Sequence, residues 1–142
     1  MATGNGGLGG CVAYPELSYM ASMGFAVVGT NNGHNGTSGK AFYNNADIVH
    51  DFASRAIHTS AIVGKQVTKA YYGEEHKKSY YTGCSTGGRQ GLKSVQEWPE
   101  DFDGVIAGAP VSCLSYRDSL HSSADISEGS FLQQFDFLVS TF

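Results

Sequence analysis

A serine flanked by glycines carries the strongest chemical signal in this sequence. Residues 83–87 (GCSTG) form a G-x-S-x-G motif, and the flanking segments predict a strand before it and a helix after it. A sharp turn from strand to helix crowds the backbone around the serine, so glycine is needed on both sides. The motif therefore predicts a nucleophile elbow, with the Ser85 hydroxyl exposed at the carboxyl edge of a sheet.

The same turn predicts an oxyanion hole. The helix after Ser85 directs the positive end of its dipole at an oxygen that becomes charged, and the N–H of Thr86 is the first donor. A glycine-rich loop ahead of the elbow, residues 6–9, predicts the second N–H, with Gly7 as the first choice. Two simpler interpretations stay open, namely a glycine turn that only starts a helix and a flexible amino-terminal segment.

Two nucleotide-binding patterns overlap these glycines, and both lack parts. Residues 83–90 approach the P-loop pattern, but Arg89 stands in place of its lysine and Gln90 in place of the hydroxyl that binds magnesium. Residues 4–9 fit G-x-G-x-x-G literally, but that fingerprint follows a strand and only three residues precede it. We therefore expect no nucleotide site.

The surrounding chain alternates between strand and helix patterns. Short apolar runs bounded by turn residues predict strands at 24–30, 79–82 and 104–107. Strands separated by helices imply an α/β fold with a parallel sheet and right-handed crossovers. The pattern weakens after about residue 110, so we expect residues 1–142 to form one partial domain.

The helices are predicted from recurring apolar positions. One or two helices run from about Ala46 to Tyr72, and Gly73 stands where a helix would stop. A further helix spans residues 87–97 and ends before Pro99. These two helical regions are the crossovers between the three predicted strands.

Composition excludes several classes of protein. The 142 residues carry 9 Lys and Arg against 13 Asp and Glu, a net charge of −4, which gives no electrostatic reason to expect nucleic acid or an anionic membrane as partner. The longest apolar runs fall far short of the roughly 20 residues that span a bilayer. Glycine is in excess, with 19 of 142 residues, and ten of them precede Lys40.

The motifs together resemble the fungal tannase and feruloyl esterase family of carboxylic ester hydrolases. The resemblance covers residues 2 to about 110 almost continuously, through ATGNGGLGGC (2–11), DFASRAIH (51–58), YYG (71–73), GCSTGGRQG (83–91) and WPEDFDGVIAGAP (98–110). It implies a partial α/β-hydrolase fold whose lid domain is missing, and ester cleavage through an acyl-enzyme with Ser85 as nucleophile. The implied substrate is a phenolic acid ester from plant cell walls or tannins, with no nucleic-acid or membrane partner.

The resemblance also implies what this chain lacks. The family's triad aspartate and histidine, and a lid domain with a calcium site, lie carboxyl-terminal to anything present, so we expect no metal or other cofactor here. In that family a disulfide joins the cysteine before the serine to one beside the catalytic histidine. Only Cys84 is present, and we expect it to be unpaired with Cys11 and Cys113. The family is secreted, although this chain shows no signal peptide.

Other polar residues are weaker candidates. His121 is the only histidine after Ser85, but Leu120 rather than cysteine precedes it. His58 is interpreted as structural. His34 either lines the pocket or, more simply, is a solvated loop histidine.

The remaining polar signals do not add a base. Asp101 and Asp103 are interpreted as turn and cap residues. Asn35 begins an Asn-Gly-Thr glycosylation sequon in a polar loop. An alternative function is therefore a non-catalytic truncated product or gene-model fragment that lacks the triad Asp and His.

Overall fold

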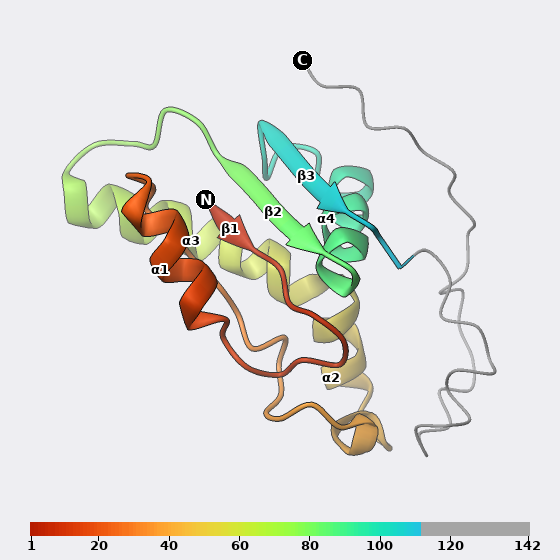
Figure 1. The fold of residues 1–142 in the computed structure, drawn as a ribbon. Coiled ribbons are helices and arrows are strands. Elements are labelled where there is room, and N and C mark those ends of the chain that lie inside the picture. Colours follow the sequence, from red (N-terminus) through yellow and green to blue (C-terminus); the bar gives the residue numbers. More distant parts are fainter. Residues whose placement is uncertain (112–142) are drawn as a thin grey trace.

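A three-stranded parallel sheet forms the centre of the computed structural model, which describes residues 1–111. The strands are β1 (Ala2–Thr3), β2 (Tyr80–Cys84) and β3 (Gly104–Gly108), in the order β1-β2-β3. Tyr81 pairs with Ala2 on one side and with Val105 on the other. Because every pairing is parallel, all three strands end at the same edge of the sheet (Figure 1).

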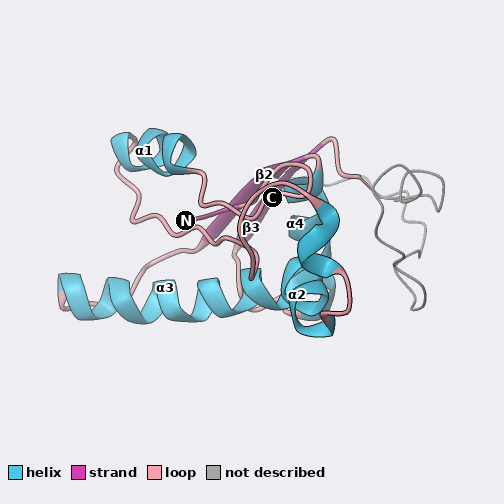
Figure 2. Cartoon of the chain, turned by 90° about the horizontal axis from the view of Figure 1, so that it is seen from below, coloured by secondary structure: helices cyan, strands magenta, loops and turns pink. Residues whose placement is uncertain are grey.

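Helices connect and cover the strands. In chain order they are α1 (Tyr14–Ser22), the 3₁₀ turn η1 (Gly39–Phe42), α2 (Ala46–His50), the π-helical turn η2 (Asp51–Arg55), α3 (Ala56–Tyr72) and α4 (Thr86–Glu97). Figure 2 shows α1 and α3 on opposite sides of the sheet. α4 contacts β2, β3 and α3, so it shares the face that α3 covers. No described helix is both long enough and apolar enough to cross a membrane.

The strand predictions hold for two of the three segments. The predictions at 79–82 and 104–107 are confirmed by β2 and β3 within two residues. The prediction of a strand over 24–30 is wrong, because the segment makes only one parallel bridge, from Val28 to Ala2. The strand it lies beside is β1, which has only two residues, so a longer ladder of backbone hydrogen bonds cannot form between them. β1 itself was not predicted.

The helix predictions are confirmed, with one omission. The region from Ala46 to Tyr72 is helical through α2, η2 and α3, and Gly73 ends it in the left-handed conformation with φ of 76°. α4 begins one residue before the predicted start. The omitted helix is α1, whose Pro15 lies in its first turn, where the missing N–H costs no hydrogen bond.

The order of the strands places a topological switch point at the carboxyl edge of the sheet. From β1 the chain passes through α1 to Val28, which bridges to the outer side of β1, and then crosses back to form β2 on the other side. The connections from β1 and β2 therefore leave in opposite directions. In open α/β sheets, ligands bind at such a switch point. The segments that meet there are the glycine loop after β1 and the turn after β2.

The apolar core lies beneath this edge. Buried Ala2, Ile57 and Tyr81 pack together, with Val28 and Phe102 at their margin. Tyr81 is completely inaccessible to solvent. The core thus joins β1, β2 and α3 directly below the switch point.

Candidate active site

Ser85 lies in the strained turn between β2 and α4. Its φ of 60° and ψ of −117° fall where non-glycine residues rarely occur, and such a conformation persists only when its surroundings hold it. The Ser85 N–H donates to the Gly108 carbonyl at 2.9 Å, and the Ser85 carbonyl accepts from the amides of Arg89 at 3.1 Å and Val111 at 3.2 Å. The elbow is therefore fixed to both β3 and α4.

The Ser85 hydroxyl makes no hydrogen bond within residues 1–111. Ser85 occupies the N-cap of α4, where a serine side chain commonly accepts a hydrogen bond from the helix, but here it makes no such bond. Within residues 1–111 the structure shows no other hydrogen bond to it. The predicted strand-to-helix context of the motif is confirmed, and the simpler interpretation of a serine that only starts a helix does not explain the strain.

Glycines allow the elbow to close. A Cβ on Gly83 would lie 2.6 Å from the carbonyl carbon and oxygen of Gly87, a separation that real Cβ atoms do not show. A Cβ on Gly87 would lie 3.2 Å from the Asn5 carbonyl oxygen and the Gly4 carbonyl carbon. The first turn of α4 thus packs backbone to backbone against both β2 and the loop after β1.

Tyr81 supports the elbow from below. Its hydroxyl donates to the Gly87 carbonyl at 2.7 Å, within the first turn of α4. Burial raises the pKa of Tyr81 above its ordinary value, so the phenol keeps its proton and remains a donor. Gly4 lies against the same hydroxyl, and a Cβ there would overlap it.

The loop after β1 is anchored beside the elbow. The Gly4 amide donates to the Thr82 carbonyl at 2.9 Å, and the Gly9 amide donates to Gly6 at 3.0 Å, which closes a tight turn. Gly7 is the first central residue of that turn, and its φ of 56° explains why glycine stands there. Gly6 and Gly7 are exposed. The loop is thus hydrogen-bonded at both ends, which does not fit the interpretation of a flexible amino-terminal segment.

Thr86 and Gly7 remain candidate donors to an oxyanion. Thr86 is the first residue of α4, so its N–H has no acceptor within the helix. The contacts of Gly87 with Gly4 and Asn5 bring the loop to the same turn of α4. The two predicted donors therefore come from segments that lie side by side.

Buried amides behind the loop form a network that sequence reasoning missed. The Asn5 side chain donates to three carbonyls, those of Gly9, Cys11 and Thr30, at 2.9 to 3.3 Å. The Gln90 side-chain oxygen accepts from the backbone N–H of Asn5 at 3.2 Å, and the Gln90 side-chain nitrogen donates to the Asn32 side-chain oxygen at 2.9 Å. No motif connects these residues, and only the glycines around them signalled a loop.

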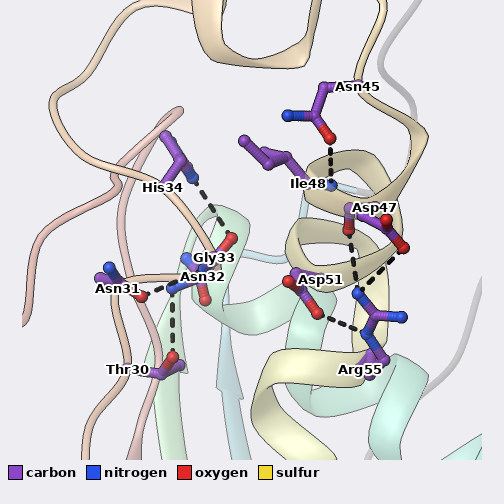
Figure 3. Close-up of polar contacts among 10 residues, drawn as sticks. All are labelled: Thr30, Asn31, Asn32, Gly33, His34, Asn45, Asp47, Ile48, Asp51 and Arg55. Atoms are coloured by element: carbon purple, nitrogen blue, oxygen red, sulfur yellow. Dashed lines mark hydrogen bonds and ion pairs between the residues drawn. The ribbon is translucent and has the colours of Figure 1, made fainter.

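His34 is not the solvated loop residue that the simpler interpretation expected. It is only 5% exposed, and its ring packs with Phe42 and Phe52 at centroid distances of 4.9 and 5.9 Å. One ring nitrogen lies 2.9 Å from the Leu8 carbonyl and the other 3.2 Å from the Asn32 carbonyl. The aromatic neighbours, distant in sequence, explain the burial, and His34 links the glycine loop to the loop drawn in Figure 3.

Arg89, which occupies the lysine position of the P-loop pattern, has a structural partner. Its guanidinium donates to the carbonyls of Phe52 and Ala53 at 3.2 and 3.0 Å, within η2, and lies over the Phe52 ring at 5.2 Å. Burial lowers its pKa below the ordinary value. The G-x-G-x-x-G pattern does follow a strand, β1, contrary to expectation, but α1 begins only at Tyr14 rather than at the last glycine.

His58 has structural partners, as expected, and the two aspartates lie in the turn region before β3, although neither caps a helix. His58 bonds to buried Asp101 at 2.8 Å and stacks on Trp98 at 4.3 Å. Asp103 accepts from the Ser79 amide at 2.7 Å, and its contact with Lys78 lowers the pKa of the Asp103 carboxyl. These groups precede β2 and β3, at the edge opposite Ser85.

The described residues bring no base to Ser85. Four histidines lie within residues 1–111, and the structure shows no hydrogen bond from any of them to the Ser85 hydroxyl: His34, His50, His58 and His76. His121 lies outside the described residues, as does Cys113. The same described range contains no group of three or more histidine, cysteine or acidic residues that could hold a metal ion.

Cys84 is an exposed free thiol, and so is Cys11. The expectation that these two cysteines are not bridged is confirmed. A pairing with Cys113 falls outside the described residues, and the proposed disulfide of a complete family member stays a prediction.

A parallel sheet with its helices and a strained serine elbow at the end of a strand define an α/β fold of the hydrolase type. A family model described as tannase and feruloyl esterase matches residues 1–133. The chain belongs to this family, and the resemblance inferred from its motifs is confirmed.

Individual relatives agree with this assignment. The chain is 66% identical over 110 residues to a probable feruloyl esterase B-1 of Aspergillus terreus, and 57% identical over 123 residues to a probable feruloyl esterase B-2 of Aspergillus flavus. These alignments cover 78% and 84% of this chain but 21% and 24% of the relatives. The crystal structure of feruloyl esterase B from Aspergillus oryzae superposes with a TM-score of 0.75 at 63% identity, covering 77% of this chain and 22% of that one. The chain therefore spans about a fifth of the length of these relatives.

Proposed function

We propose that this chain carries the nucleophile and oxyanion hole of a carboxylic ester hydrolase that cleaves phenolic acid esters through an acyl-enzyme. The observation that carries the proposal is Ser85, which is held at φ of 60° with a hydroxyl that makes no hydrogen bond in the described part of the chain. Strained residues with unused nucleophilic groups are typical of active sites. The names of the relatives supply the substrate class.

The chemistry follows from the site's residues. The Ser85 oxygen attacks the ester carbonyl and its proton passes to a general base, while the carbonyl oxygen gains negative charge. The N–H groups of Thr86 and Gly7 stabilise that charge. As the intermediate collapses, the base returns the proton to the leaving oxygen, so that the alcohol departs and the serine stays acylated. Water then attacks the acyl group and releases the phenolic acid. The base and its aspartate are supplied by residues outside 1–111.

The alternative, a non-catalytic product, has one observation in its favour. Within residues 1–111 no histidine makes a hydrogen bond to the Ser85 hydroxyl, and general-base activation typically contributes about 10² to 10⁴ in rate. On that alternative the chain keeps the fold and at most a binding role. We expect no cofactor within the chain on either hypothesis, and a partner limited to the ester substrate.

Labelling with a fluorophosphonate tests the proposed nucleophile. We expect the full gene product to be labelled on one serine, in the tryptic peptide of residues 79–89, and to hydrolyse methyl ferulate or methyl gallate. Labelling elsewhere in a product that hydrolyses these esters would reject Ser85. A correctly folded full gene product that neither reacts nor hydrolyses them would favour the non-catalytic alternative. The 142-residue chain expressed alone is expected to hydrolyse the same esters only feebly.

Export of the protein is part of the proposal and has its own test. Asn35 and Thr37 of the sequon are both exposed, and Gly36 between them has a φ of 83°, in a loop open to an enzyme that adds glycans. We expect the gene product secreted from a fungal host to lose mass on treatment with an endoglycosidase, and the Asn35→Gln variant to lack that glycan. An unmodified Asn35 in the secreted protein would contradict the prediction.

A further inference from the structure

Gln90 connects the two segments that the proposed oxyanion hole needs. It lies on α4 one turn after Thr86 and is 1% exposed. Its side-chain oxygen accepts from the Asn5 amide at 3.2 Å, immediately before Gly6 and Gly7. The helix that begins with one proposed donor is thus hydrogen-bonded to the loop that carries the other.

The nitrogen of the same amide reaches a third segment. It donates to the Asn32 side-chain oxygen at 2.9 Å, and the Asn32 nitrogen donates to the Gly9 carbonyl at 3.0 Å. Asn32 is fully buried and has a φ of 55°, which is unfavourable for a side-chain-bearing residue. The backbone N–H of Asn32 donates to the Thr30 hydroxyl at 3.1 Å, as Figure 3 shows, and this bond helps to hold that conformation.

The network contacts both sides of the exposed Gly6–Gly7 turn. Gln90 binds the residue before the turn, and Asn32 binds Gly9, the residue that closes it. Asn5 is 5% exposed and spans the base of the turn through its bond to the Gly9 carbonyl. Both polar atoms of the Gln90 side chain and both of the Asn32 side chain are bonded in this network, while Asn5 uses its side-chain nitrogen and its Oδ1 has no partner among the described residues. Because buried amides without partners are costly, Gln90 and Asn32 favour the arrangement in which they are bonded.

We propose that Gln90 is a positioning residue, which sets the distance between the amides of Gly7 and Thr86 through its bonds to Asn5 and Asn32. We call the hydrogen-bonded set of Asn5, Asn32 and Gln90 the clamp. Its effect on catalysis rests on the proposed function, whereas its effect on the order of the glycine loop does not. Oxyanion stabilisation depends on donors placed in advance, and a displacement of about 1 Å can lower the rate by about 10².

Three variants of the full gene product test the inference. Gln90→Met keeps the length of the side chain and removes both bonds, whereas Gln90→Glu keeps the acceptor for the Asn5 amide and loses the donor to Asn32. Gln96→Met, at an exposed position of the same helix, is the matched control. Hydrogen exchange of residues 4–10 reports on the clamp, and steady-state kinetics on a phenolic methyl ester report on catalysis.

We expect Gln90→Met to speed exchange in residues 4–10 at least about tenfold and to lower kcat by about 10- to 100-fold with KM within about twofold. Gln90→Glu is expected to fall between Gln90→Met and the wild type in both measurements, and Gln96→Met to match the wild type. A role confined to stability would lower the melting temperature and leave the kcat of the folded enzyme unchanged.

The outcomes separate the clamp from the proposed function. Unchanged exchange in folded Gln90→Met would overturn the clamp, whatever the activity. Faster exchange with an unchanged kcat would show that the loop does not serve the reaction, and would overturn the positioning role. If the wild type fails to react with a fluorophosphonate, the proposed function fails while the exchange data still decide the clamp.

Discussion

The Ser85→Ala variant of the full gene product is expected to lose at least about 10⁴ in kcat on phenolic methyl esters, because no covalent intermediate can form without the hydroxyl. The loss in kcat should exceed any change in KM, since the hydroxyl contributes little to holding the ground-state ester. Hydrolysis of methyl ferulate, followed by release of the acid, measures both constants.

The stability of Ser85→Ala should change little, in contrast to its activity. Alanine must adopt the same positive φ as serine, and the serine side chain makes no hydrogen bond within residues 1–111 that alanine would lose. The free energy of unfolding should therefore stay within about 0.5 kcal/mol of the wild type, as for substitutions that remove no special contact. Ser18→Ala, at an exposed serine of α1 whose side chain makes no hydrogen bond within residues 1–111, is the control for both measurements. Retention of more than a small fraction of turnover by Ser85→Ala would exclude Ser85 as the nucleophile.

The Gly83→Ala variant is expected to lose about 3 kcal/mol of stability, at the upper end of what over-packing usually costs. The new methyl group would meet the Gly87 backbone at 2.6 Å and the Tyr81 hydroxyl at 2.8 Å. The Gly87 backbone cannot move alone, because it is part of α4 and accepts the Tyr81 hydrogen bond. The whole first turn of α4 must shift, so the midpoint of denaturant unfolding should fall.

The same shift should also reduce catalysis in the molecules that remain folded. Ser85 and Thr86 move with the first turn of α4, and we expect kcat to fall by about 10². Gly6→Ala is the control for stability, since a Cβ there has no neighbour within 4 Å and Gly6 needs no positive φ. Equal stability of Gly83→Ala and Gly6→Ala would refute the close packing of β2 against α4.

Two kinds of signal made the fold predictable. Regular spacing of apolar residues located the helices from Ala46 to Tyr72, and Gly73 marked their end because a left-handed residue is easiest for glycine. Alternation of strands and helices implied the parallel sheet, which the register of β2 with its two neighbours confirms. These signals are local, so they survive in the residue types alone. α1 was missed because none of its residues is buried and its apolar face is weak.

The elbow was predictable for a related reason, and the residues that hold it were not. A sharp turn needs glycine close to the serine, and the five consecutive residues 83–87 show this pattern. By contrast, Gln90 lies 58 residues from Asn32 and 85 from Asn5. Amide side chains accept many partners, so no pattern says which one each will find until the chain has folded.

The sequence by itself therefore determined the parallel α/β arrangement and the position of the serine elbow, since steric needs of the backbone and apolar periodicity act over short distances. The family was recognised from the resemblance of its motifs. Only the tertiary structure decided that residues 24–30 make a single bridge, because pairing depends on how much partner strand is available. It also decided that His34 is buried, because Phe42 and Phe52 close around it. The same long-range contacts placed the glycine loop against α4, where Gln90 joins the two.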